Sequence, residues 1–567
     1  MKMKNKFLKF FIAASFITFS ACETLELDQV ENPNQPNADL LDVNFAFNNV
    51  QLSLRGFVNA NNGFAQRMTR QLAMTGGPTY NNSFQAVSFN GIWGSGYGLL
   101  QNIAQMEPKA QASGLNYQLG AAKVIKSYVW MSLADVFGDI PYSEALQGNA
   151  NLAPNFDSSA AVYVGTLAEL DAAIALLSQP ALSYPKDDFY YSTTGGVVNA
   201  TSQARWLTAA KTMKLRLLNT ARLNGAALGV NVAAEITSLL NENDLIDTPA
   251  EDFAFKYGNN RAVPNTRHPS YNQQYENNNA IGGTYLGNYM MWTVVREKAV
   301  GDPRRTFYFF RQDTNTVGED IFTLGCAFQV APSHYGGAQY ASFYQPSVLT
   351  PFCVTLTSGY WGRDHGDASG LPPDMRKRTV VGVYPAGGKL DENVQAHVQN
   401  NGVDGFLGAG IMPIMMTSWV HFIKAEAILT LGVPGDARAE LEAGMRASIN
   451  KVINFHPVPA AAVPTATSIN TYVDYVLNAY DAATAAQRLE IVIKEYYIAA
   501  WGNGLEPYNN YRRTGYPSNF QPTLNPSPGD FFSTALYPAD SVVNNPNAPA
   551  NSRTNKVFWD TANITLH

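Results

Sequence analysis

The sequence is poor in charged residues and in cysteine. Asp, Glu, Lys and Arg make up 15% of the 567 residues, and the formal net charge is −6. A chain without a basic excess lacks the positive face that binding to nucleic acid phosphates requires. The only cysteines are Cys22, Cys326 and Cys353, and their spacing fits no zinc site. Cys326 and Cys353 either pair in an oxidising compartment or stay as two thiols, and the sequence alone leaves both open.

Common catalytic and cofactor-binding motifs are absent as well. The sequence contains no HExxH, GxSxG, P-loop or CxxC pair. The glycine-rich segment 94–98 follows no predicted strand and lacks a glycine at the third required position, which argues against a dinucleotide site. Residues 313–318 resemble the start of a calcium loop, but Leu324 stands where an EF-hand has Glu. We therefore expect no cofactor, with a looser structural calcium site in this segment left open.

One cluster of ionisable residues resembles a catalytic site. Residues 363–367 read Arg-Asp-His-Gly-Asp and follow Trp361. Asp364 and Asp367 are candidates for a pair of glycosidase carboxylates, although sequence cannot set their separation. A solvated turn with local ion pairs is the favoured interpretation, and contact with a polar ligand is a third.

The N-terminus has the pattern of a secretory signal. Four lysines lie within the first nine residues, residues 10–19 carry no charge, and small residues precede Cys22. This order of a positive end, an apolar run and a cleavage site predicts a signal peptide over residues 1–21. Cysteine at the first mature position resembles a bacterial lipoprotein signal, which makes Cys22 the predicted lipidation site. The apolar run is too short to span a bilayer, and we expect no other spanning stretch.

The remaining chain divides by its apolar periodicity. Residues 22–43 are rich in Asn, Pro and acids, which predicts a flexible leader. Helical periodicity covers residues 44–245 and returns at about 413–432, 436–452 and 469–502. Between them, residues 253–410 are rich in Gly, Asn and aromatics and show no long amphipathic helix. We expect one mainly α domain over 44–567, with paired helices and a loop-rich, partly β insert that binds ligand.

Aromatic residues outside regular elements form the predicted binding surface. Flat rings stack on the apolar faces of sugars, while amide and guanidinium groups bond the hydroxyls. Packing of the loops onto the helical body is the alternative explanation for any single ring. The predicted ligand-binding residues are Tyr80, Asn81, Trp93, Tyr289, Trp292, Tyr335, Tyr340, Trp361 and Arg363.

A series of short motifs points to a family. In chain order they are Trp93-x-x-x-Tyr97, Lys126-Ser127-Tyr128, 137–142 (Phe-Gly-Asp-Ile-Pro-Tyr), 424–427 (Lys-Ala-Glu-Ala), 495–497 (Glu-Tyr-Tyr) and 511–517 (Tyr-Arg-Arg-Thr-Gly-Tyr-Pro). Behind a lipoprotein signal, this ordered set resembles the SusD/RagB family of nutrient-binding outer-membrane lipoproteins. The resemblance implies tetratricopeptide-like helix pairs and no catalysis. It also implies a lipid-anchored protein on the cell exterior that passes oligosaccharides, or peptides, to a SusC-like TonB-dependent transporter.

Each motif also has a predicted structural role. Gly138 should end a helix and Pro141 should fix the turn after it. Arg512 and Arg513 should pair with Glu495 or bond backbone carbonyls. A lipid-anchored glycoside hydrolase and a helical scaffold with protein partners alone remain the alternatives to glycan or peptide capture.

Overall fold

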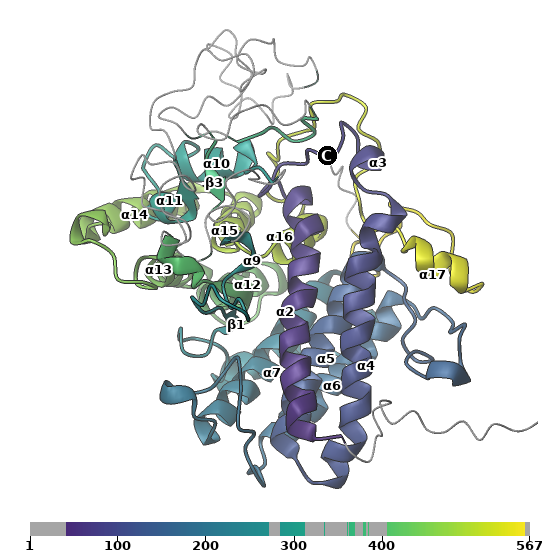
Figure 1. Cartoon of the computed structure of the whole chain (residues 1–567). Coiled ribbons are helices and arrows are strands. Elements are labelled where there is room, and N and C mark those ends of the chain that lie inside the picture. The colour runs from purple at the N-terminus through teal and green to yellow at the C-terminus, as the bar shows by residue number, and fades with distance from the viewer. Residues whose placement is uncertain are drawn as a thin grey trace, which may run out of the picture.

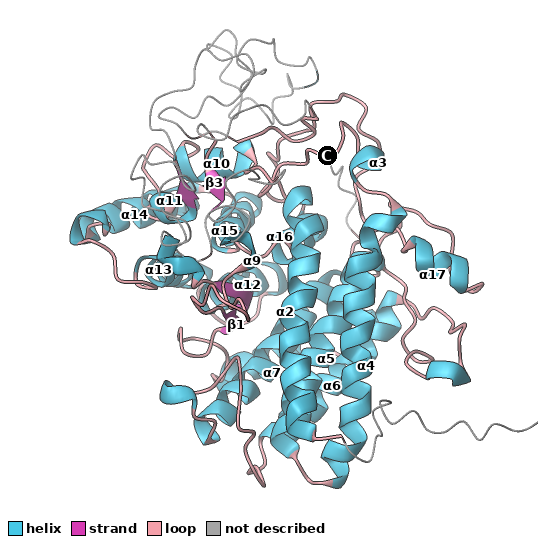
Figure 2. Ribbon diagram, viewed as in Figure 1, coloured by secondary structure: helices cyan, strands magenta, loops and turns pink. Residues whose placement is uncertain are grey.

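The described chain is built mainly from helices (Figures 1 and 2). The structure is a computed structural model that describes residues 41–271, 284–311, 334, 360, 362–368, 378–381, 384 and 405–561. Several sequence predictions lie outside these residues, namely the signal peptide, Cys22, most of the leader, Cys326, Cys353 and the calcium-loop-like segment 313–324.

Long helices that pack against their neighbours in sequence form the N-terminal half. They are α2 (Val43–Met68), α4 (Asn90–Ala112), α5 (Asn116–Phe137), α6 (Ser159–Leu177), α7 (Ala200–Ala221) and α8 (Val232–Glu242), with the short α3 (Tyr80–Ser83) between α2 and α4. In Figure 1, α2, α4 and α5 stand side by side. Almost every side of α5 is buried, so this helix forms the centre of the bundle.

Local signals in the sequence set the ends of these helices. α5 ends at Gly138, whose φ of 80° suits glycine, as the sequence predicted. The hydroxyl of Ser158 accepts a hydrogen bond from the amide of Ala161 and caps α6. α7 begins after Asn199, which is its capping residue and forms a capping box with Ser202.

The C-terminal half pairs helices in the same way. It contains α12 (Thr417–Leu431), α13 (Ala437–Ile453), α14 (Ala466–Ala482), α15 (Ala485–Ala499), α16 (Leu505–Thr514) and the short α17 (Ala539–Asn544). Two helices, α14 and α15, divide the segment 469–502, for which the sequence indicated helical periodicity without a break. Thr484 interrupts it, because its side chain and that of Gln487 form a capping box that starts α15.

Short elements occupy the described part of the insert. They are β1 (Phe253–Lys256), α9 (Pro269–Tyr271), α10 (Asn288–Val295), α11 (Arg305–Tyr308), β2 (Phe309–Phe310), β3 (Val380–Val381) and, just after the insert, β4 (Ile411–Met415). β1 pairs antiparallel with β4, and β2 pairs antiparallel with β3. The expected lack of long helices therefore holds for the described residues of this segment.

α6 corrects one expectation about membrane-spanning segments. By length and apolar composition alone, Ser159–Leu177 could cross a bilayer, although we expected no such stretch after the signal peptide. The core helices of soluble proteins pass the same test. α6 packs against α5 and α7 and buries Tyr163 and Leu170, which accounts for its apolar character.

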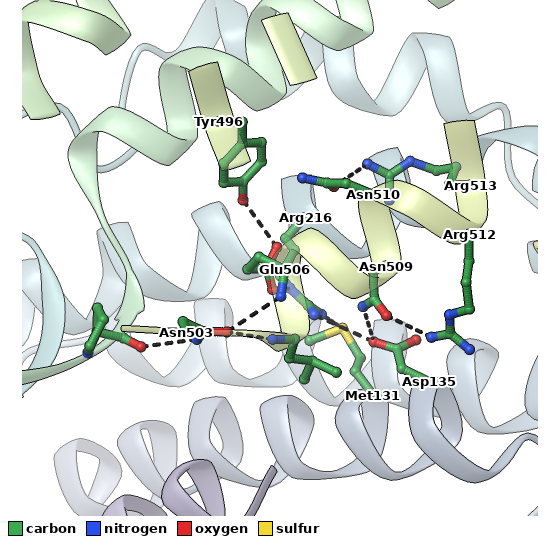
Figure 3. Close-up of polar contacts among 12 residues, drawn as sticks. Met131, Asp135, Arg216, Tyr496, Asn503, Glu506, Asn509, Asn510, Arg512 and Arg513 are labelled. Carbon is green, nitrogen blue, oxygen red and sulfur yellow. Dashed lines mark hydrogen bonds and ion pairs between the residues drawn. The ribbon is translucent and has the colours of Figure 1, made fainter. Parts of the chain in front are cut away.

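A buried polar network joins the two halves (Figure 3). Arg216 of α7 donates to Glu506 of α16 at 2.6 Å and contacts Asp135 of α5 at 3.4 Å. Asn509 donates to the same Asp135 at 2.7 Å, and Tyr496 donates to Glu506 at 3.0 Å. Because these groups are buried, each charge depends on its partners, and the network fixes α16 against α5 and α7.

The motif arginines belong to this buried structure. Arg513 pairs with Glu426 of α12 through contacts of 2.9 and 2.8 Å, and Arg222 pairs with the same carboxylate. The predicted pairing with Glu495 is therefore wrong, because Glu495 faces Lys298 and Arg304 instead. The prediction that one arginine bonds a carbonyl is confirmed. Arg512 donates to the backbone oxygen of Ser533.

Candidate functional site

The structure separates the predicted ligand-binding residues into three groups. Tyr335, Tyr340 and Trp361 lie outside the described residues. Tyr80, Tyr289, Trp292 and Arg363 are buried. Asn81 and Trp93 reach the surface.

The buried aromatics take part in packing between distant segments. The Tyr80 ring makes edge contacts with Phe531 and Phe532, and Tyr289 packs in the same way on Phe520. Lys494 donates to the Tyr289 hydroxyl at 2.6 Å, and its ammonium lies 5.6 Å from the centre of the Trp292 ring. These contacts favour the packing explanation for the three rings, and contact with ligand stays a prediction.

Arg363 belongs to a buried turn. A backbone bridge joins Arg363 to Gly287, and its guanidinium lies 4.4 Å from the centre of the Tyr285 ring. Asp364 and His365 are each only 1% exposed. The interpretation of residues 363–367 as a solvated turn is therefore wrong, because neighbouring segments cover this turn.

Burial changes the protonation of this turn. Asp364 accepts hydrogen bonds from Asn288 and Gln521 on one oxygen, while its other oxygen has no partner in the described structure. Burial raises the pKa of Asp364 from 3.8 to about 6. Burial, aided by the nearby Arg70, lowers the pKa of His365 well below its ordinary value, so the imidazole is neutral. Hydrogen bonds therefore hold one oxygen of Asp364 inside the protein, whereas both ring nitrogens of His365 lack a hydrogen-bond partner in the described structure.

The surface groove beside Trp93 is the best candidate for a binding site in the described residues. It encloses about 390 Å³, which falls in the range that small-ligand sites occupy. Trp93 and Tyr97 line it together, with ring centres 4.7 Å apart. The other lining residues are Asn90, Gly94, Pro141, Ala145, Leu146, Leu152, Pro154, Pro538, Asp540, Ser541, Asn544 and Asn545.

Neighbouring groups hold the two rings in place. Phe137 meets Trp93 edge to face at 5.0 Å, and the Tyr97 hydroxyl donates to the Pro141 carbonyl at 2.7 Å. Because Phe137 and Pro141 flank the turn that ends α5, the motif at 137–142 positions the groove. Pro141 thus follows the helix end as predicted and also forms part of the wall.

The glycines of α4 explain both its packing and the opening of the groove. A Cβ on Gly96 would lie 2.9 Å from Phe57, so this glycine allows α4 to approach α2 closely. Gly94 and Gly98 face open space, where a Cβ would meet nothing within 4 Å. Gly94 lines the groove and Gly98 does not. Segment 94–98 lies within α4.

α17 forms the opposite wall of the groove. In Figure 1, α17 lies beside the N-terminal end of α4. Asn90 donates to the Asp540 carboxylate at 2.7 Å, and Asn545 donates to the Pro154 carbonyl at 2.9 Å. These bonds join α4, α17 and the segment after Pro141. Sequence reasoning missed this wall, because nothing local in the C-terminal segment indicates that residue 540 meets residue 90.

The chemistry of the groove suits a neutral ligand. Asp540 is the one residue with a charge at neutral pH among the described residues that line it. Within the described parts of the chain, no group of three or more His, Cys, Asp or Glu side chains is placed to hold a metal ion. The groove offers an aromatic surface with amides, the Ser541 hydroxyl and one carboxylate around it, a set that can bind a polar ligand.

The exposed Asn81 lies elsewhere on the surface. Its side-chain oxygen accepts a hydrogen bond from Arg553. It does not line the groove, so the structure does not bring Asn81 and Trp93 into one site.

Two family models match the chain. One, described as "Starch-binding associating with outer membrane", matches residues 35–347, which is more than half of the chain. The other, described as "Susd and RagB outer membrane lipoprotein", matches residues 408–554. No curated protein matches the chain.

Solved structures share this fold. A SusD homologue from Bacteroides fragilis is 18% identical, with 92% of this chain and 99% of that chain covered and a TM-score of 0.63. A SusD/RagB family protein from Bacteroides thetaiotaomicron is 20% identical, covers 92% and 100%, and has a TM-score of 0.61. A chitin-binding SusD homologue from Flavobacterium johnsoniae is 18% identical, covers 93% and 100%, and has a TM-score of 0.62. With its helix pairs, its buried motif residues and these matches, the chain belongs to the SusD/RagB family of outer-membrane lipoproteins.

Proposed function

We propose that this protein captures oligosaccharides at the cell surface and delivers them to a SusC-like TonB-dependent transporter. The observation that supports ligand binding is the groove of about 390 Å³, in which Trp93 and Tyr97 stand among asparagines, prolines, Ser541 and the single carboxylate of Asp540. The family consists of binding proteins, and one relative of the same fold is described as chitin-binding. These findings support glycan as the cargo.

Sugar rings match the lining of the groove. Their C–H faces stack on aromatic rings, and their hydroxyls bond amides and carboxylates. Trp93 and Tyr97 provide the rings, and Asn544 and Asp540 provide exposed polar groups beside them. An open site with few polar contacts favours modest affinity, which suits a protein that releases its cargo to a transporter.

The predicted lipid on Cys22 gives this binding its location. After removal of the predicted signal peptide, 1–21, the lipid on Cys22 would hold the folded body at the outer membrane. The family descriptions support this localisation. The predicted leader, 22–43, would let the body move relative to the anchor. The transporter completes the proposal, because a binding protein cannot itself move cargo across the membrane.

Peptide cargo is the second candidate function. The observation in its favour is Leu152, which lines the groove and is 75% exposed. An exposed aliphatic side chain beside several prolines also suits an apolar peptide side chain. The two cargoes require different polar contacts, so a binding assay can separate them.

Isothermal titration with a panel of ligands tests the proposal. The probes are chitohexaose, cellohexaose, maltohexaose and a mixture of defined hexapeptides. We expect at least one hexasaccharide to bind, and Gly94→Leu to weaken that binding at least tenfold by filling the groove. Gly98→Leu is the matched control, since it adds the same side chain on the same helix outside the groove. Binding of peptides alone would replace glycan with peptide, and no binding at all would contradict capture of either cargo class.

A further inference from the structure

The groove beside Trp93 carries an uneven distribution of charge. Its described lining contains no Lys, Arg or His, while the carboxylate of Asp540 is exposed at its wall. A neutral saccharide meets no electrostatic penalty there. An anionic saccharide would bring a second negative charge close to Asp540 without a cation to balance it.

We infer that this groove selects uncharged saccharides and rejects those that carry carboxylate or sulfate groups. The inference rests on the proposed function, because it concerns the cargo class of the same site. It goes further in assigning the selection to one side chain, Asp540, and to the lack of Lys, Arg and His among the described residues of the wall. Rejection of the wrong charge is a common way to obtain specificity from a site with few attractive contacts.

Hydrogen bonds hold the carboxylate where it can act. One oxygen of Asp540 accepts from Asn90 at 2.7 Å, and the backbone oxygen of Asp540 accepts from Asn544 at 2.8 Å. The bond to Asn90 ties the side chain to the N-terminal end of α4, only three residues before Trp93. A sugar stacked on Trp93 would therefore lie close to this charge.

The expected size of the selection follows from Coulomb's law. Two like charges about 6 Å apart repel enough to weaken binding by about threefold in the dielectric of water and by about a hundredfold in the effective dielectric near a protein surface, so we expect about tenfold for this solvent-exposed carboxylate. The effect should fall as salt is raised, because the Debye length is about 8 Å at physiological ionic strength. Selection that comes from shape alone would not change with salt.

Matched pairs of glycans provide the test. The neutral probes are chitohexaose, cellohexaose and maltohexaose. Each is compared with its C6-oxidised form, in which primary hydroxyls have become carboxylates. Titrations at 20 mM and 500 mM NaCl should show that the oxidised form binds about tenfold more weakly at low salt and that the gap narrows at high salt.

Two variants test whether Asp540 causes the difference in affinity between neutral and oxidised glycans. Asp540→Asn should reduce the ratio between neutral and oxidised affinities to near one. Asp474→Asn removes one exposed charge from α14, away from the groove, and should keep the wild-type ratio.

Equal or tighter binding of the oxidised form would overturn the inference while leaving glycan capture intact. A ratio that survives in Asp540→Asn would overturn the assignment to this side chain. If neither the neutral nor the oxidised glycans bind, the proposed function is contradicted, and the inference about charge is contradicted with it.

Discussion

Asp364→Asn should make the protein more stable at neutral pH. The side chain is fully buried, and the sum of its contacts leaves its pKa raised to about 6 from an ordinary value of 3.8. Its unpartnered oxygen has neither a cation nor a hydrogen-bond donor in the described structure. The folded state therefore holds an ionised carboxylate at a cost that the neutral amide does not have.

The expected gain in the free energy of unfolding follows from the folded and the ordinary pKa of Asp364. Each pH unit between them corresponds to about 1.4 kcal/mol, so ionised Asp364 destabilises the folded state by about 3 kcal/mol above pH 6. The new amide group occupies the place of the unpartnered oxygen, where an unsatisfied donor costs about 1 kcal/mol. We expect a net gain of about 2 kcal/mol at pH 7.5.

The stabilisation by Asp364→Asn should depend on pH in a defined direction. The folded pKa of Asp364 lies above the unfolded value, so the folded protein takes up a proton first as pH falls. Its destabilising effect is complete above pH 6 and disappears as pH falls towards 3.8. The gain from Asp364→Asn should therefore be present at pH 7.5 and lost by pH 4.5.

Urea unfolding at these two pH values measures the effect. Asp367→Asn is the control from the same turn, since this partly exposed carboxylate lies 3.7 Å from the Arg363 guanidinium and its loss should cost up to about 1 kcal/mol. Destabilisation by Asp364→Asn at pH 7.5 would refute the reasoning. The variant also tests the hydrolase alternative, which requires that it abolish any turnover of glycan.

Three further predictions concern stability and localisation. Glu426→Gln removes the charge shared by two buried arginines and should cost about 3 kcal/mol in urea unfolding, whereas Glu440→Gln nearer the surface should cost less than about 1 kcal/mol; equal costs would contradict the role of the buried network. Gly138→Ala places a side chain at a φ of 80° and should lower stability by about 1 kcal/mol, measurable as a lower Tm; an unchanged Tm would show that the turn relaxes. Cys22→Ala should leave glycan binding in solution unchanged and abolish uptake by cells, and uptake that persists would show that the anchor is dispensable.

Much of the helical framework could be predicted from local sequence. The end of α5 at Gly138 and the cap of α6 at Ser158 are signals carried by a few adjacent residues, so they could be recognised without the fold. The break at Thr484 carried the same kind of signal in its capping box with Gln487, and it was missed because apolar periodicity continues on both sides.

The candidate site could be predicted only in part. Trp93 was predicted as one of a set of aromatic residues taken to lie outside regular elements, although it lies in α4. Asp540 was not predicted, since its contact with Asn90 joins residues 450 positions apart. The same limit explains Tyr80 and Tyr289. Their local sequence resembles an exposed loop, yet segments from the distant C-terminal part of the chain cover both rings. The residues next to a buried side chain do not indicate that a segment distant in the sequence covers it.

A crystal structure of the protein with a bound hexasaccharide would show whether the groove beside Trp93 is the glycan-binding site. The ligand should be the one of chitohexaose, cellohexaose and maltohexaose that binds best in titration. A sugar ring should lie against Trp93, between α4 and α17, with Asp540 or Asn544 bonded to its hydroxyls. A sugar bound elsewhere, with the groove beside Trp93 empty, would contradict this prediction.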